Sequence, residues 1–213
     1  MNFDAFAKQV PKIKNLPLLG EEAHFKMAPA FRSAELKRLQ NQRKNAKQSA
    51  VLSLFYPSEK NTVNLLLMLR KTYKGVHSNQ VGFPGGKVEK DDLSLMHTAL
   101  RETHEEVGVH PKKIEIVSKL SSIYIPPSNF EVHPYIGLYS KPSPFVIQES
   151  EVELLIEVPL TDFMDDEKII TQNLSTSYAK NVDVPAFKLN GYIVWGATAM
   201  MLSELKDLLK QVL

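Results

Sequence analysis

The sequence predicts an α/β chain of the α+β kind, in which a mixed sheet lies between helices. Short apolar segments of strand length recur along the chain. Two longer segments, at about 93–107 and 198–213, place apolar residues at helical spacing. Strands that alternate with two principal helices indicate a sheet covered by helices, because each element must bury its apolar face.

The first part of the chain differs in sequence pattern from the remainder. We expect residues 1–47 to form an N-terminal extension that packs on a domain spanning 48–213. Within the extension, apolar residues have the spacing of a short amphipathic helix, which Pro11 interrupts. These apolar residues are Phe3, Phe6, Val10 and Ile13.

The first two strands are expected at 50–56 and 63–70, joined by a turn at 57–61. Both are continuously apolar, which predicts burial on both faces of the sheet. Further strands are expected at 113–124, 130–140, 151–158 and 168–174. The helix at 93–107 follows the first two strands, and the helix at 198–213 is the last element.

Composition excludes several classes of protein. The hydrophobic fraction of 43% and the charged fraction of 23% are typical of a soluble globular chain. A net charge of +2 does not indicate binding to nucleic acid or to an anionic membrane. The sequence has no run of eighteen apolar residues and no pattern of a signal peptide. The absence of cysteine excludes disulfides and thiolate chemistry and suits a cytoplasmic location. Association into a homodimer is left open.

Three glutamates in the helix at 93–107 are the main candidates for chemistry. Positions three and four apart share a face of a helix, so Glu102, Glu105 and Glu106 are expected on one side. The Glu106 side chain is expected to face solvent and metal rather than the core. Clustered carboxylates repel one another, and oxygen ligands suit hard cations such as Mg²⁺ or Mn²⁺. The alternative is a solvated helix face with Arg101 paired to Glu105.

Glycines on both sides of the helix favour the metal site over the solvated face. Gly85 and Gly86 precede the acidic segment and allow a close approach of backbone to a ligand. Gly108 follows the last apolar helical residue and is placed as a helix stop. The segment therefore predicts a site for a metal ion and a phosphate group.

This segment resembles the Nudix box, the loop–helix–loop of Nudix hydrolases, written G-x5-E-x7-R-E-U-x-E-E-x-G-U with U apolar. The matching residues are Arg101, Glu102, Glu105, Glu106, Gly108 and Val109. Thr103 stands where an apolar residue is usual. One extra residue between Gly86 and Arg101 leaves Asp92 one place from the usual first glutamate, which puts the role of Asp92 in doubt.

The resemblance implies a Nudix-type α/β/α sandwich and a metal-dependent hydrolase of nucleoside diphosphates linked to another group. It implies Mg²⁺ or Mn²⁺ bound by Glu102, Glu105 and Glu106, with the Gly86 carbonyl as a further ligand. It also implies that Arg101 orients a glutamate. The general base is either a box glutamate such as Glu105 or an acidic residue of a distant loop, for which Glu151 is the candidate.

A second group of residues resembles the coenzyme A pyrophosphatase subfamily, whose box is commonly one residue longer. Upstream of the box, an apolar strand ends at Arg70, and His77-Ser78-Asn79-Gln80 leads into Phe83-Pro84-Gly85-Gly86, with Asn79 in place of the usual glycine. Trp195-Gly196-Ala197-Thr198-Ala199 resembles the start of the last helix of that subfamily.

The subfamily resemblance implies hydrolysis of coenzyme A to 3′,5′-ADP and 4′-phosphopantetheine. Arg70, His77 and Gln80 are the candidates for substrate binding. The fork geometry of Arg70 suits a phosphate, with a structural salt bridge as an equal alternative. Two other functions remain open: a Nudix enzyme for ADP-ribose or dinucleotides, and a non-catalytic nucleotide-binding module. The expected partner is a small nucleotide rather than a nucleic acid or a membrane.

Overall fold

The computed structural model describes residues 1–29, 38–71, 80–174 and 181–213. Within these residues, eight strands form the larger sheet, with β3-β2-β1-β7-β5 as its main order. Their bounds are β1 Lys47–Pro57, β2 Val63–Arg70, β3 Val81–Gly82, β4 Gly85–Lys87, β5 Glu115–Lys119, β6 Ile123–Ile125, β7 Phe130–Leu138 and β8 Val152–Pro159. The remaining three strands pair as follows: β4 with β1, β6 with β7, and β8 with β2.

A smaller sheet has the order β11-β10-β9, formed by β9 Ile169–Leu174, β10 Val182–Leu189 and β11 Tyr192–Val194. The α-helices are α1 Phe3–Gln9, α2 Glu21–His24, α4 Leu95–Val107, α5 Leu160–Met164 and α6 Gly196–Val212. Short 3₁₀ helices are η1 Val10–Asn15, η2 Phe25–Met27, η3 Leu39–Asn45, η4 Pro111–Lys113 and η5 Asp166–Lys168.

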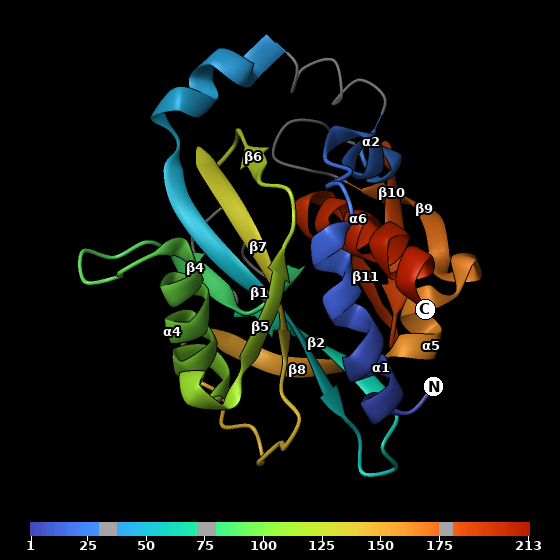
Figure 1. Ribbon diagram of the computed structural model, residues 1–213. Helices are drawn as coiled ribbons and strands as arrows, with labels where there is room; N and C mark the ends of the chain where they lie inside the picture. Colours follow the sequence, from blue (N-terminus) through green and yellow to red (C-terminus); the bar gives the residue numbers. More distant parts are fainter. Residues whose placement is uncertain (30–37, 72–79, 175–180) are drawn as a thin grey trace.

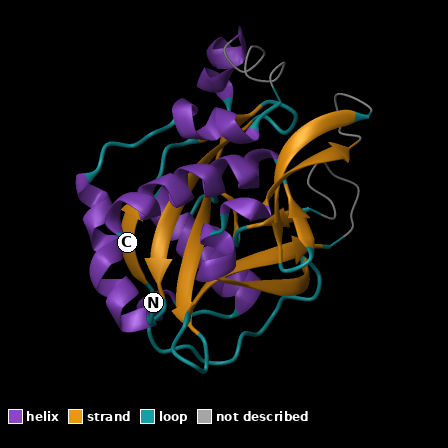
Figure 2. Cartoon of the chain, turned by 90° about the vertical axis from the view of Figure 1, so that its right-hand side faces the viewer, coloured by secondary structure: helices purple, strands orange, loops and turns teal. Residues whose placement is uncertain are grey.

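The long strands lie between two layers of helices. Figure 1 shows α4 on one side of these strands and α1 with α6 on the other. The sheet is mixed, because β1 pairs with β2 antiparallel and with β7 parallel. Figure 2 shows the chain with the side of α1 and α6 turned toward the viewer. The predicted fold class, a mixed sheet between helices, is therefore confirmed.

Apolar side chains of β2 enter both layers of the core. Leu65 and Leu67 join the cluster beneath α1 and α6, whereas Leu66 and Met68 join the cluster beneath α4. Successive side chains of a strand point to opposite faces, so a strand covered on both faces is apolar throughout. The predicted burial on both faces is confirmed.

The sequence prediction was wrong for several strands. The strand expected at 113–124 is split into β5 and β6, because the Ser121 backbone N–H and hydroxyl between them donate to the Glu204 carboxylate on α6. The strands β3, β4, β10 and β11 were not expected. Pro185 lies inside β10, and proline argues against a strand when only the local sequence is considered.

The N-terminal segment contributes to the main core. Phe3, Phe6, Val10 and Ile13 are buried in the cluster that includes α6. They lie in α1 and η1, and the change from one helix type to the other occurs next to Pro11. Strand β1 begins at Lys47, beside the expected boundary of the extension.

A buried carboxylate joins this segment to α6. Glu204 is fully buried, and its oxygens accept hydrogen bonds from the N–H groups of Leu19 and Gly20 at 3.1 Å each. Ser121 donates its N–H and hydroxyl at 3.0 and 2.6 Å, and His24 Nε2 lies 3.1 Å away. Burial alone would raise the pKa of Glu204, but these hydrogen bonds outweigh it and hold the pKa at about 2.

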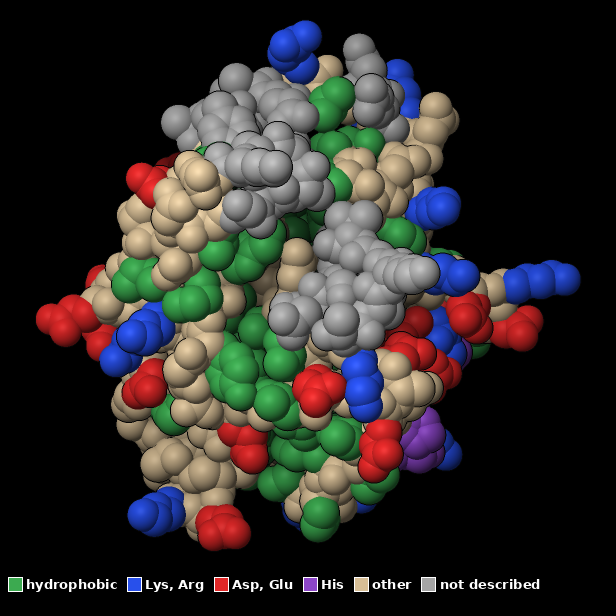
Figure 3. All heavy atoms as spheres, turned by 180° about the vertical axis from the view of Figure 1, so that it is seen from behind, with side chains coloured by type: hydrophobic (Ala, Val, Ile, Leu, Met, Phe, Trp, Pro, Cys, Tyr) green, Lys and Arg blue, Asp and Glu red, His purple; other side chains and the backbone are tan. Residues whose placement is uncertain are grey.

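Charges of both signs are interspersed on the face of the molecule shown in Figure 3, around a centre where apolar side chains gather. No helix within the described ranges is long and apolar enough to cross a membrane.

Candidate active site

Helix α4 has well-defined ends that explain its length. The hydroxyl of Ser94 accepts a hydrogen bond from His97 N–H at 3.1 Å, as an N-cap does. Leu93, expected to be the first helical residue, precedes this cap and is exposed. Gly108 adopts φ 76° and donates its N–H to His104 carbonyl at 3.0 Å, which ends the helix.

The three box glutamates have different surroundings. The Glu106 side chain is fully buried, the Glu102 side chain is 13% exposed, and the Glu105 side chain is 49% exposed. The expectation that Glu106 faces solvent was therefore wrong. Glu106 points toward Arg70 at the end of β2 and toward Gly85 at the start of β4, and these contacts cannot be deduced from helical spacing.

Arg101 holds the acidic loop to α4. Its guanidinium donates to both oxygens of Asp92, from Nε at 2.9 Å and from Nη2 at 3.0 Å. The same side chain reaches Glu105 at 3.0 Å and Glu102 at 3.1 Å. Arg101 therefore pairs with two glutamates in this structure, and its role in orienting them stays a prediction.

The Asp92 side chain is buried and joins the loop to α4, despite the extra residue between Gly86 and Arg101. Its side chain is 1% exposed and accepts hydrogen bonds from Thr98 hydroxyl at 2.8 Å and Glu89 N–H at 2.9 Å. The hydrogen bonds from Arg101 hold the pKa of this carboxyl well below its usual range, against the opposing effect of burial. The loop accommodates the extra residue while keeping the pair with Arg101.

Glu106 has few partners for a buried carboxylate. Its Oε2 accepts a hydrogen bond from Gly85 N–H at 2.7 Å. Its Oε1 lies 3.2 Å from Arg70 Nη1, close enough for an ion pair, yet this buried oxygen has no aligned hydrogen bond. Burial raises the pKa of Glu106 to about 7, assisted by the charges of Glu102 and Glu151 and opposed by Arg70 and Gly85.

The two glycines before the helix bring backbone close to the glutamates. Gly85 has φ 146°, and a Cβ there would collide with the Ala50 carbonyl and Val51. A Cβ on Gly86 would collide with the carboxylate of Glu102. Glycine at these positions leaves room for the Glu102 side chain and for the close approach of β4 to β1.

Glu151 lies at the end of a loop that is tied to α4. Gln148 N–H donates to the Glu106 carbonyl at 3.0 Å, and Val146 N–H donates to the Val107 carbonyl at 3.1 Å. Burial raises the pKa of Glu102, and the Glu151 charge contributes to this rise as it does for Glu106. Glu151 thus lies close enough to Glu102 and Glu106 for its charge to raise their pKa values. The loop residues Val146 and Gln148 were missed, because nothing in their local sequence indicates these contacts.

The donor set fits a hard divalent cation. No group of three His, Asp or Glu side chains in the described part of the chain converges tightly enough to hold a metal ion by itself. However, a buried oxygen without a hydrogen bond is costly, and Glu106 Oε1 is such an atom. Mg²⁺ commonly takes only one or two carboxylates from the protein and completes its shell with water and substrate phosphate. Glu102 and Glu106 with backbone oxygen beside them match that pattern.

The expected substrate-binding residues have separate outcomes. Arg70 lies at the end of β2, where its Nη2 donates to the Gly85 carbonyl at 2.6 Å and its Nη1 pairs with Glu106. The structural salt bridge, one of the two roles expected for Arg70, is therefore formed. The Gln80 carbonyl accepts a hydrogen bond from Arg70 N–H at 3.0 Å. His77 lies outside the described residues.

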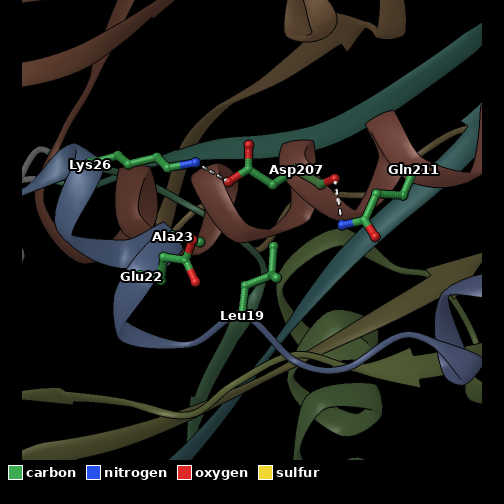
Figure 4. Close-up of a pocket in the computed structure, with 6 residues that line it drawn as sticks. All are labelled: Leu19, Glu22, Ala23, Lys26, Asp207 and Gln211. Atoms are coloured by element: carbon green, nitrogen blue, oxygen red, sulfur yellow. Dashed lines mark hydrogen bonds and ion pairs between the residues drawn. The ribbon is translucent and has the colours of Figure 1, made fainter.

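A cavity of about 280 Å³ lies elsewhere, between α2 and the C-terminal half of α6. Figure 4 shows its lining residues, among them Lys26 and Asp207, which pair with each other at 2.8 Å. The box glutamates lie on α4, on the opposite side of the main strands, so this cavity is separate from the candidate active site.

Comparisons with known proteins show the family of the chain. The family model described as NUDIX domain matches residues 46–171. The uncharacterized Nudix hydrolase NudL of Enterobacter sp. strain 638 is 32% identical over 162 residues, which cover 76% of this chain and 82% of that protein. NudL of Pectobacterium atrosepticum is 34% identical over 151 residues, covering 68% and 74% of the two chains.

Solved structures show the same fold at low identity. The Nudix hydrolase RenU from M. smegmatis superposes with a TM-score of 0.54 at 13% identity, covering 79% of this chain and 88% of that chain. The MutT protein from Methanosarcina mazei Go1 gives a TM-score of 0.51 at 16% identity, covering 78% and 95%.

Proposed function

The chain belongs to the Nudix hydrolase family, and on that premise we propose that it hydrolyses the diphosphate linkage of coenzyme A or its derivatives with Mg²⁺ or Mn²⁺. The products are 3′,5′-ADP and 4′-phosphopantetheine. The observation that supports hydrolysis most directly is the buried and incompletely bonded carboxylate of Glu106, which lies near the charges of Glu102 and Glu151.

The proposed reaction is attack of water on a phosphorus atom of the diphosphate, with loss of the other phosphate as the leaving group. Glu102, Glu106 and the Gly86 carbonyl would hold the cation, and Glu105 would join them after release from Arg101. When bound, a divalent cation neutralises phosphate oxygens and lowers the pKa of water. Arg101 orients Glu102 and Glu105 through its ion pairs.

Glu151 is the proposed general base, which removes the proton from the attacking water. Its loop is fixed to the end of α4 by hydrogen bonds to the carbonyls of Glu106 and Val107, so its backbone position is set relative to the box. A base must lie within reach of the proton that it removes. Glu105 is the alternative base, but the Arg101 ion pair occupies its carboxylate in this structure.

The coenzyme A specificity rests on resemblance in sequence. The upstream segment that ends at Gln80 and the longer box are shared with coenzyme A pyrophosphatases, and Asp92 keeps the longer loop attached to Arg101. We propose His77 and Gln80 as residues that contact the substrate. The box residues Glu102, Glu105 and Glu106 are all present, which argues against a non-catalytic nucleotide-binding module.

A substrate panel tests the proposal. The purified chain is assayed with coenzyme A, dephospho-coenzyme A, ADP-ribose, NADH and diadenosine polyphosphates, in Mg²⁺ and in Mn²⁺, with EDTA as the control. Coenzyme A is expected to give the highest kcat/KM, and 3′,5′-ADP should be identified among the products. A higher kcat/KM for ADP-ribose or a dinucleotide would overturn the coenzyme A proposal and leave the family assignment intact.

A further inference from the structure

Arg70 occupies a special place in the larger sheet. Alternation along β2 puts Arg70 on the same face as Leu66 and Met68, the face that α4 covers. The pairing with β8 shifts its register at this point, because Leu69 lies opposite Leu154 whereas Arg70 lies opposite Val152. Such irregularities redirect side chains and are frequent beside active sites.

The Arg70 side chain closes a cycle of contacts with Gly85 and Glu106. Its Nη2 donates to the Gly85 carbonyl at 2.6 Å, and its Nη1 lies 3.2 Å from Glu106 Oε1. The cycle is completed by Gly85 N–H, which donates to Glu106 Oε2 at 2.7 Å. One peptide unit and one carboxylate are thus fixed by a single guanidinium.

Both terminal nitrogens of Arg70 are engaged within the protein. The side chain is 23% exposed, and its Nε lies near Gly82, where a Cβ would be 3.9 Å from it. A planar guanidinium suits this arrangement because its fork can bind two acceptors in fixed directions, which an ammonium cannot do. A phosphate of the substrate would have to compete with the Gly85 carbonyl and with Glu106.

The ion pair also leaves Glu106 able to bind a cation. Arg70 compensates part of the buried negative charge, yet Glu106 Oε1 has no aligned hydrogen bond and keeps its lone pairs available. A carboxylate that is saturated with hydrogen bonds would be a poorer ligand, and one without a countercharge would be costly to bury.

We propose that Arg70 is a positioning residue, which fixes Glu106 and the start of β4 at Gly85–Gly86 in the arrangement that receives a divalent cation. It does not bind the phosphate groups of the substrate. This inference rests on the proposed metal-dependent function for the purpose of the arrangement. It departs from the expectation that Arg70 contacts the 3′-phosphate of coenzyme A.

The first test compares Arg70→Lys and Arg70→Gln with wild type on coenzyme A and dephospho-coenzyme A. A residue that orients metal ligands typically contributes tenfold to a hundredfold. We expect Arg70→Lys to lower kcat about tenfold, and Arg70→Gln more, with equal losses on the two substrates and KM changed less than about threefold. A loss confined to coenzyme A, carried by KM, would overturn the proposal.

Direct binding of Mn²⁺ gives a readout that does not depend on turnover. The dissociation constant is measured by electron paramagnetic resonance of free Mn²⁺, without nucleotide. Arg70→Gln should weaken binding about tenfold. Arg43→Lys is the matched control, because Arg43 forms an ion pair with Glu131 at 2.6 Å and this pair is not on α4. This substitution should change neither kcat nor Mn²⁺ binding. Unchanged Mn²⁺ binding in Arg70→Gln would contradict the positioning role.

A third measurement detects the contact with Glu106 in the metal-free chain. The unfolding equilibrium constant is determined in EDTA for Arg70→Gln in the wild-type and Glu106→Gln backgrounds. The destabilisation should be at least about threefold smaller in the second background, because no buried charge is then left without a counterion. Equal effects in both backgrounds would refute the coupling. If wild type hydrolyses no substrate of the panel, the proposed function fails, while Mn²⁺ binding and this coupling still decide the role of Arg70.

Discussion

Glu106 on α4 and Glu204 on α6 are both fully buried, and they differ in what surrounds them. Both oxygens of Glu204 accept hydrogen bonds, supplied by Leu19, Gly20, Ser121 and His24. Glu106 receives one hydrogen bond, from Gly85, and keeps an oxygen without any. Accordingly, the pKa of Glu204 is held at about 2, whereas the pKa of Glu106 is raised to about 7.

The difference separates a carboxylate that stabilises the fold from one that we propose serves a reaction. The donors around Glu204 come from the N-terminal segment, from the link between β5 and β6, and from α2. These donors provide hydrogen bonds to both oxygens of the Glu204 carboxylate, so this carboxylate needs no cation. At Glu106 the protein supplies too few donors, and a divalent cation would supply what is missing.

The largest expected effect is the loss of stability in Glu204→Gln. The substitution removes the charge and turns an amide group toward backbone N–H donors, which breaks a buried network. We expect about 3–5 kcal/mol of destabilisation in urea unfolding monitored by circular dichroism. Asp207→Asn, which breaks the more exposed pair with Lys26 on the same helix, should cost under about 1 kcal/mol. If the two variants lose equal stability, the comparison fails.

Glu106→Gln should show the reverse behaviour, with lost turnover and a retained fold. The amide keeps the shape of the side chain and can still accept from Gly85 N–H, but a negative ligand is lost. At saturating Mg²⁺, kcat should fall about 10²-fold or more, equivalent to about 3 kcal/mol in the barrier. The free energy of unfolding should stay within about 1 kcal/mol of wild type, because a buried charge and its ion pair disappear together. Near-normal turnover would contradict the metal assignment.

The two carboxylates should also give pH dependences of opposite sign in metal-free protein. Glu204 has an ordinary pKa of 4.5 when unfolded and about 2 when folded, so its contribution is complete above pH 4.5 and is lost as pH falls toward 2. The pKa of Glu106 is 4.5 in the unfolded chain and about 7 in the folded chain. Its contribution to the free energy of unfolding therefore decreases as pH rises from 4.5 to 7.

Each of these two effects should amount to about 2–3 kcal/mol across its window. Unfolding free energies of wild type, Glu204→Gln and Glu106→Gln are measured in EDTA from pH 2 to pH 8. Subtracting each variant from wild type isolates one carboxylate. Difference curves that slope in the same direction for both residues would refute the assignment of two distinct environments.

The smallest expected effect is the stabilisation of the folded chain by Mn²⁺. At ten times the dissociation constant, a ligand that binds only the folded state adds about 1.4 kcal/mol to the free energy of unfolding. Wild type and Glu204→Gln should gain equally, and Glu106→Gln should gain much less. Equal gains in all three proteins would show that Mn²⁺ binds at a different place.

Local patterns predicted the elements on which the site is built. The apolar spacing, Gly108 and the acidic triad located α4, and its start differed only because Ser94 caps the helix after the exposed Leu93. Continuous apolar residues located β2 and predicted its burial on both faces. These properties depend on residues that are neighbours in the sequence.

Features that depend on distant partners could not be predicted. Helical spacing placed Glu105 and Glu106 on one side, but Arg101 draws Glu105 outward while Arg70 and Gly85 receive Glu106 inside. The break after β5 likewise depends on Glu204, which lies far along the chain. In each case the deciding contact joins segments that come together only in the folded sheet.

The pairing of the larger sheet has a consequence for the time course of folding. Strand β1 pairs in parallel with β7, and β2 pairs with β8, so the central strands contact segments far away in the sequence. Contacts of that kind form slowly, because a long loop must close before they are gained. The backbone hydrogen bonds of α4 are local, so this helix can form early, whereas Arg70 on β2 and the loop before β8 come to it from distant parts of the chain. We therefore expect helical circular dichroism to recover before Mn²⁺ binding when the chain refolds from denaturant.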